Sequence, residues 1–159
     1  GMAKKTIYKH FTDKAALFRA LVHGHDVVEA WTQPAGADGP HSDFRETLLG
    51  LVSYVLSPRQ LTLTRLVISE ARKSPDLARF FYRECIDKAQ QMAGERLRSV
   101  MPDGTAVAQA GLMADMVLGA TLGQLHLRAL ILDVDRETLD RDLRERIERV
   151  VAIFPHPPD

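Results

Sequence analysis

The stretch TAVAQAGLMADMVLGATLGQLHLRALIL, residues 105–132, is the longest candidate helix of the chain and decides its fold class. Its apolar residues recur every three or four positions, the period of an α-helix, over roughly 40 Å at about 1.5 Å per residue. Gln124, His126 and Arg128 interrupt its most apolar part, which argues against a transmembrane span and a membrane partner. No stretch of the chain shows the sustained apolar–polar alternation of a strand, so we expect an all-α fold.

The segments on either side of residues 105–132 also have helical apolar spacing. Towards the carboxyl terminus, residues 136–154 combine an apolar stripe with charged pairs such as Glu145–Arg149. Towards the amino terminus we expect helices over 75–100 and 58–73, and a third that Ser42 opens, with Glu46 near the capping-box position. Breaks rich in proline, glycine or serine separate these helices, at 33–40, 57–58, 74–76 and 101–104.

The charge balance excludes a general attraction to nucleic acid, because 21 basic residues offset 21 acidic ones and the net charge is zero. Any affinity for DNA must therefore be local. The single cysteine, Cys85, cannot form an internal disulfide or a paired-cysteine metal site, and the amino terminus carries no export signal. We therefore expect a cytoplasmic protein in a reducing compartment.

The sequence does not favour an enzyme. It contains no glycine-rich phosphate loop, no zinc-protease helix motif and no Glu-x-x-His pair of the di-iron type, so we expect no cofactor. His23, His25 and Asp26 are potential metal ligands, but helical residues two positions apart point in different directions, so we expect no metal site. Nothing in the sequence places a base beside Cys85, and we expect an inert, buried thiol there.

The amino-terminal segment, residues 1–14, carries a local positive charge. The segment contains four lysines, at positions 4, 5, 9 and 14, and one acidic residue, Asp13, so its net charge is +3. Phosphate contacts are therefore expected here rather than elsewhere. In the short helix expected over 4–11, Ile7 and Phe11 share one face and can anchor it to the next helix, which we expect over 13–32. A helix of two turns is unstable alone, so its neighbours must hold it.

Residues 1–18, GMAKKTIYKHFTDKAALF, resemble the end of the helix-turn-helix signature of the TetR family: a turn glycine, a recognition helix and the start of a linking helix. The resemblance implies a DNA-binding transcriptional regulator with Gly1 in the turn. The DNA-contacting residues that it implies are Lys4, Lys5 and Tyr8 at or beside base edges in the major groove, and Thr6, His10 and Lys14 at phosphates.

The resemblance also implies two domains within a TetR-like helical bundle. Residues 1–32 would hold the carboxyl-terminal part of the helix-turn-helix domain and the linking helix, and residues 33–159 the helical ligand-binding and dimerisation domain. The two helices that precede the signature in the family are not part of the sequence. Two interpretations stay open. In the first, Gly1-Met2 is the turn of the family's motif and the two helices precede it; in the second, Met2 is the start methionine and the DNA-binding domain is incomplete.

In the TetR family, the last two long helices of each subunit pack against their counterparts in a four-helix dimer interface. The helix expected over 105–132 carries three glycines on one line. Each glycine destabilises a helix by about 1 kcal/mol relative to alanine, so their presence needs a reason. The reason that we expect is close packing against the backbone of another helix. A monomeric bundle is the alternative. The interface residues that we predict are Gly111, Gly119, Gly123, Leu143 and Ile147.

The family also houses a small-molecule cavity between the linking helix and the dimer helices. Aromatic and methionine side chains suit such an apolar, adaptable cavity, and ordinary core packing is the alternative for each of them. The pocket residues that we predict are Trp31, Tyr54, Leu66, Phe81, Tyr82, Cys85, Met92, Met113, Met116 and His126.

These observations lead to the hypothesis of a homodimeric, ligand-responsive repressor. Its partners are expected to be a palindromic operator in double-stranded DNA, a second copy of the chain and a small-molecule effector. The DNA-binding domains of the two subunits would be about one turn of DNA apart, roughly 34–36 Å, or a multiple of it. The alternative is a helical dimer that binds small molecules or another protein without binding DNA.

Overall fold

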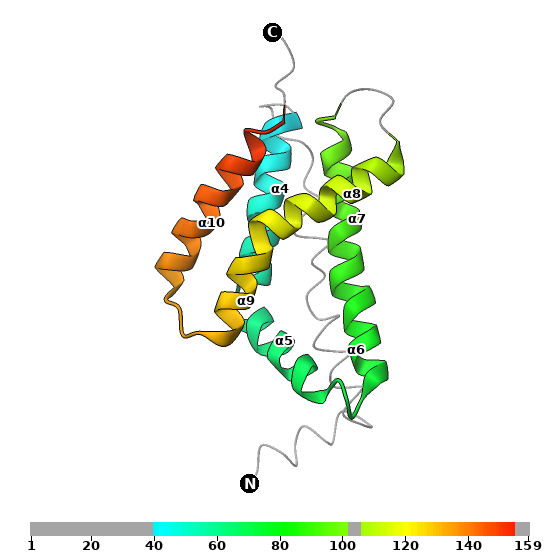
Figure 1. Ribbon diagram of the computed structural model, residues 1–159, viewed down its shortest axis with the longest axis vertical. Coiled ribbons are helices and arrows are strands. Elements are labelled where there is room, and N and C mark those ends of the chain that lie inside the picture. Colours follow the sequence, from blue (N-terminus) through cyan, green and yellow to red (C-terminus); the bar gives the residue numbers. More distant parts are fainter. Residues whose placement is uncertain (1–39, 102–105, 155–159) are drawn as a thin grey trace.

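The computed structural model describes residues 40–101 and 106–154, and every regular element in these ranges is a helix (Figure 1). The predicted all-α fold is confirmed. The helices expected over 4–11 and 13–32 lie outside the described residues. The elements are α4 (Pro40–Val55), α5 (Pro58–Glu70), α6 (Pro75–Phe81), η1 (Tyr82–Asp87), α7 (Lys88–Arg98), α8 (Val107–Leu118), η2 (Gly119–Gly123), α9 (Gln124–Ile131) and α10 (Arg136–Val151), where η1 and η2 are π-helical.

Local capping chemistry sets the start of α5. This helix begins at Pro58, as predicted, and the Ser57 hydroxyl accepts a hydrogen bond from the amide of Gln60 at 3.4 Å. The start of α4 differs from the prediction. The helix begins at Pro40, so Ser42 lies inside it and not at its start.

The main core lies between α4, the end of α7, α8, α9 and α10. Figure 1 shows α4 and α10 side by side, while α8 crosses α7 and leads through η2 into α9. Phe44 of α4 packs edge-on against Phe154, just beyond α10, with ring centroids 5.5 Å apart. The largest fully buried side chains are Phe44, Leu48, Leu51, Val52, Leu56, Leu97, Thr121, Leu125, Leu143 and Ile147.

A second, smaller apolar cluster joins α5 to α6. Leu63 and Val67 of α5 meet Leu77 and Phe81 of α6, and each side chain is 7–8% exposed. This cluster is separate from the main core. The end of the molecule that contains α5 and α6 is therefore stabilised by its own apolar contacts.

Arg65 ties α5 to the carboxyl end of α9. Its Nη2 donates a hydrogen bond to the carbonyl of Ala129 at 2.6 Å, and its Nε donates to the carbonyl of Leu130 at 3.0 Å. These carbonyls belong to the last turn of α9, where an α-helix leaves its carbonyls without an amide partner in the helix. The guanidinium of Arg65 therefore caps α9 and holds the smaller cluster against the main core.

The helix predicted over 75–100 is continuous but contains the π-helical segment η1. Not all of its apolar side chains are buried, because Tyr82 and Ile86 are 51% and 39% exposed. Phe81 and Ala93 face the interior instead. Phe81 lies in the smaller cluster and Ala93 in the main core, so the two ends of this helix pack against different parts of the molecule. Between them η1 has a wider turn, since π-helical hydrogen bonds span i→i+5.

Candidate ligand site and docking face

Polar side chains gather where α4, α5 and η1 meet. Gln60, which is 8% exposed, donates a hydrogen bond from Nε2 to the phenol oxygen of Tyr54. Partial burial, followed by the proximity of Cys85, raises the pKa of the Tyr54 phenol. Tyr54, Gln60 and Cys85 therefore form a half-buried polar group beside the smaller apolar cluster.

His126 contributes a further polar atom from α9. Its side chain is half-buried, and Nε2 is out of contact with water and has no hydrogen-bond partner among the described residues. Burial lowers the pKa of the imidazole, which favours the neutral ring at physiological pH. A neutral imidazole offers one donor and one acceptor. His126 can therefore form one directed hydrogen bond with a polar group placed beside it.

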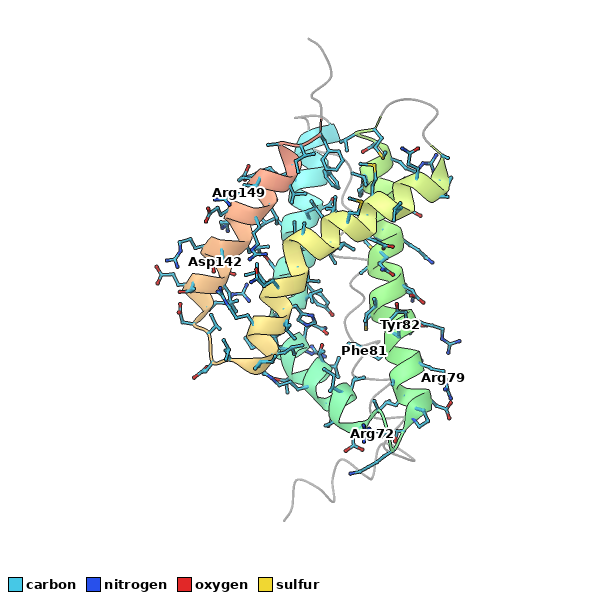
Figure 2. The ribbon with its side chains drawn as sticks, in the orientation of Figure 1. Arg72, Arg79, Phe81, Tyr82, Asp142 and Arg149 are labelled. Carbon is cyan, nitrogen blue, oxygen red and sulfur yellow. The ribbon has the colours of Figure 1, made fainter. Side chains whose placement is uncertain are left out.

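The predicted pocket residues do not share one environment. Five of them are half-buried, Phe81 belongs to the smaller apolar cluster, and three are exposed. Figure 2 shows Phe81 and Tyr82 on α6 and η1, on the opposite side of the molecule from Asp142 and Arg149 of α10. Trp31 lies outside the described residues. The half-buried set is Tyr54, Cys85, Met92, Met113 and His126, and the exposed set is Leu66 at 37%, Tyr82 at 51% and Met116 at 66%.

Cys85 is expected to react slowly. Its half-burial, with Glu84 adding a smaller contribution and Lys88 opposing it, raises the pKa of the thiol to about 11. Because the thiolate is the nucleophile, alkylation by iodoacetamide at neutral pH should be about 300-fold slower in the folded protein than in urea, where the pKa returns to about 8.5. The folded rate should keep rising with pH up to about 11. A folded rate that levels off near pH 8.5 would contradict this environment for Cys85.

An apolar face covers the outside of the helix formed by α8, η2 and α9. We call these side chains the outer apolar face: Leu112, Met116, Leu127 and Ile131, each 58–68% exposed. The predicted interface glycines Gly111, Gly119 and Gly123 are also exposed, and a Cβ added at any of them would meet no atom within 4 Å. Large apolar side chains and unobstructed backbone therefore lie on the same helix.

Two of the predicted interface residues lie elsewhere. Leu143 and Ile147 are each 1% exposed and belong to the main core. Their stripe on α10 packs against α4 and the helices beside it in the same chain. These side chains therefore present no surface to a second copy, and we correct the predicted interface accordingly. The remaining face of α10 is charged and includes the predicted ion pair between Glu145 and Arg149.

Sequence reasoning missed four residues of these sites, three on the outer apolar face and Gln60. Leu112, Leu127 and Ile131 belong to the outer apolar face, and the four-residue spacings from Leu112 to Met116 and from Leu127 to Ile131 were the available signal. Gln60 carried no such signal, because its burial depends on the fold around Tyr54.

Several predictions concern features outside these sites. Among residues 40–101 and 106–154, no three His, Cys, Asp or Glu side chains come together in a way that could hold a metal ion. In the same ranges, no helix has both the length and the apolar character that a bilayer crossing requires. The predicted DNA-contacting residues Lys4, Lys5, Thr6, Tyr8, His10 and Lys14, and the histidines at 23 and 25, lie outside the described residues.

Comparison with known proteins gives one family and one fold. Residues 43–156 match the family model described as AefR-like transcriptional repressor, C-terminal domain. The fold resembles the 1.54 Å crystal structure of a TetR-family transcriptional regulator from Mesorhizobium loti MAFF303099, with a TM-score of 0.67 and 21% sequence identity over 96% of this chain and 81% of that chain. No curated protein matches the chain. Because the family model covers well over half of its residues, the chain belongs to the TetR family of transcriptional regulators.

Proposed function

We propose that the chain is a homodimeric, ligand-responsive transcriptional repressor that binds palindromic double-stranded DNA in the cytoplasm. The match of residues 43–156 to a repressor C-terminal domain, behind a basic segment with the helix-turn-helix pattern, carries this proposal. Residues 1–32 carry the carboxyl-terminal part of the DNA-binding domain and the linking helix. Residues 33–159 form the effector-binding and dimerisation domain.

In this proposal a second copy of the chain covers the outer apolar face. Four large apolar side chains at 58–68% exposure are unfavourable in water, so their burial lowers the free energy, and a two-fold axis buries the same patch on both copies. Gly119 and Gly123 support close approach, because nothing in the same chain occupies the space beside them. Met116, predicted above as a pocket residue, belongs to this interface instead.

The effector site consists of the half-buried residues of the predicted pocket: Tyr54, Cys85, Met92, Met113 and His126. Methionine side chains adapt to apolar ligands of different shape, and Nε2 of neutral His126 supplies one hydrogen bond. We therefore expect a small, mainly apolar effector with one polar group. To release DNA, the effector must bind the DNA-free conformation more tightly than the DNA-bound one. The coupling is reciprocal: bound DNA weakens the affinity for the effector by the same factor by which bound effector weakens the affinity for DNA.

The test is selection of DNA by the full chain from random duplexes, followed by fluorescence anisotropy on the enriched sequence. The repressor proposal predicts a palindrome whose half-sites are about one DNA turn apart. It also predicts an affinity that falls steeply with salt, because lysines displace counterions from phosphates. The double variant Lys4→Ala/Lys5→Ala should weaken binding by at least about 10-fold, since each phosphate or base contact contributes on the order of 1 kcal/mol or more.

The matched control is Arg96→Ala/Arg98→Ala, which removes the same charge from the last turn of α7 and should leave DNA affinity unchanged. Equal losses in the two double variants would mean that only net charge matters. Absent enrichment, or binding that is insensitive to salt, would contradict DNA recognition and would leave a helical dimer without a DNA partner.

A further inference from the structure

Positive charge is concentrated at the turn between α5 and α6. Residues 71–83 contain four basic side chains and one acidic side chain, so their net charge is +3, the same as that of residues 1–14. The chain as a whole is neutral, so this segment departs clearly from the average. All four basic side chains are exposed. We call them the basic end: Arg72, Lys73, Arg79 and Arg83.

The charges of the basic end are largely uncompensated. Arg72, Lys73 and Arg83 form no ion pair with any of residues 40–101 and 106–154. Arg79 pairs with Asp76 at 2.6 Å, but the two side chains are 67% and 92% exposed, so water screens the pair. The basic end is therefore open to an anionic partner.

The two basic side chains of the turn also have no capping role within the described ranges. The turn after α5 is closed by its main chain, because the amides of Lys73 and Ser74 donate to the carbonyl of Glu70 at 2.9 and 2.8 Å. The side chains of Arg72 and Lys73 bind no carbonyl of residues 40–101 and 106–154. Arg65 differs, since its guanidinium caps α9. Hydrogen bonding in the fold therefore does not account for the charge of the turn.

The basic end lies where the DNA-binding segment can reach it. Figure 1 shows the α5–α6 turn at one end of the molecule, and the start of α4 beside the end of α10 at the opposite end. Figure 2 shows Arg72 at the α5–α6 end and Arg79 on the outer side of α6. The helix expected over residues 13–32 would be about 30 Å long, against about 24 Å for the 16 residues of α4. It is therefore long enough to lead back along α4 to the α5–α6 end.

We infer that the basic end binds phosphates of the DNA duplex beside the base pairs that residues 1–14 contact, and so adds affinity that does not depend on sequence. The inference rests on the proposed function for its duplex, and it adds a second region to the phosphate contacts expected at residues 1–14. Long cationic side chains on a turn and along the helix after it suit a row of phosphates. A single small anion would instead require donors directed at one point.

Fluorescence anisotropy with the full chain tests this inference on the palindromic duplex selected above, from about 50 to 200 mM salt. The double variant Arg72→Gln/Lys73→Gln removes two positive charges per subunit, and each phosphate contact contributes about 0.9 to the slope of log Kd against log salt. For a dimer we expect binding at low salt to weaken at least about 10-fold and the slope to become shallower by about 2–4. The loss should be equal on a scrambled duplex, because phosphates carry no sequence information.

The matched control is Arg98→Gln/Arg144→Gln, which removes the same charge from exposed positions on α7 and α10 and should leave DNA affinity within about twofold. Equal losses in the two double variants overturn the inference. An unchanged slope for Arg72→Gln/Lys73→Gln also overturns it, and a lower melting temperature in that case would assign both side chains to the stability of the turn. If the unaltered chain binds the palindrome and only this comparison is negative, the inference fails alone. If the unaltered chain binds no duplex, the proposed function fails with it.

Discussion

The substitution Met116→Glu is expected to convert the dimer into monomers with an unchanged fold. Met116 is 66% exposed on α8, so a carboxylate there is well solvated in the single chain. In the dimer the same carboxylate would be buried in an apolar interface, once from each copy, without a basic partner from the outer apolar face. We expect the dissociation constant to rise at least about 100-fold, equivalent to about 2.7 kcal/mol, in sedimentation equilibrium.

The matched control for Met116→Glu is Ile68→Glu. Ile68 is 63% exposed on α5, outside the outer apolar face, so this substitution introduces the same charge at a similarly exposed position. It should leave the dissociation constant within about threefold of the unaltered chain. If Met116→Glu and Ile68→Glu have the same effect on assembly, the outer apolar face is not the interface.

The substitution Phe44→Ala is expected to destabilise the fold more than any change on the surface. Phe44 is 1% exposed, and its ring meets Phe154 edge to face at a centroid distance of 5.5 Å, which joins α4 to the end of α10. Truncation removes the burial of a phenyl ring and leaves a cavity, at a cost of about 3–5 kcal/mol. Urea unfolding at one fixed protein concentration measures this cost, because dimerisation makes stability concentration-dependent.

Tyr82→Ala serves as the control for Phe44→Ala, since it truncates an aromatic ring of similar size that is 51% exposed on η1. Its cost should be within about 1 kcal/mol. A loss below about 1 kcal/mol for Phe44→Ala would mean that α4 and α10 do not share a core in this region.

The all-α fold could be predicted from the sequence because apolar spacing and proline breaks are local signals. The spacing in residues 105–132 predicted a helix, and the helix is there, but the π-turn at η2 could not be predicted. Residues four positions apart in a helix differ in direction by only about 40°. Over a few turns, the same apolar spacing therefore fits both a regular helix and a helix with one extra residue. Only the burial of both Val117 and Ala129 in the main core, 12 positions apart where three regular turns take about 11, distinguishes the two.

The candidate sites were less predictable, because apolar residues on a helix do not reveal which neighbour covers them. Met113 and Met116 lie three positions apart, yet Met113 packs against the main core and Met116 is on the outer apolar face. Leu143 and Ile147 form an apolar stripe that the chain itself buries. Arg65 binds carbonyls 64 and 65 positions away, a distance over which the sequence carries no local signal.

The solvent accessibility of the Met116 methyl group in solution tests most directly that this regulator assembles through the outer apolar face. With ¹³C-labelled methionine methyl groups, a soluble paramagnetic agent broadens the NMR signals of exposed methionines, and Met116→Leu identifies the signal. We predict that the Met116 signal is protected to about the level of the core-packed Met113, and that Leu127→Glu abolishes this protection by separating the copies. A Met116 signal that is broadened in the unaltered chain as strongly as in Leu127→Glu would contradict assembly through this face.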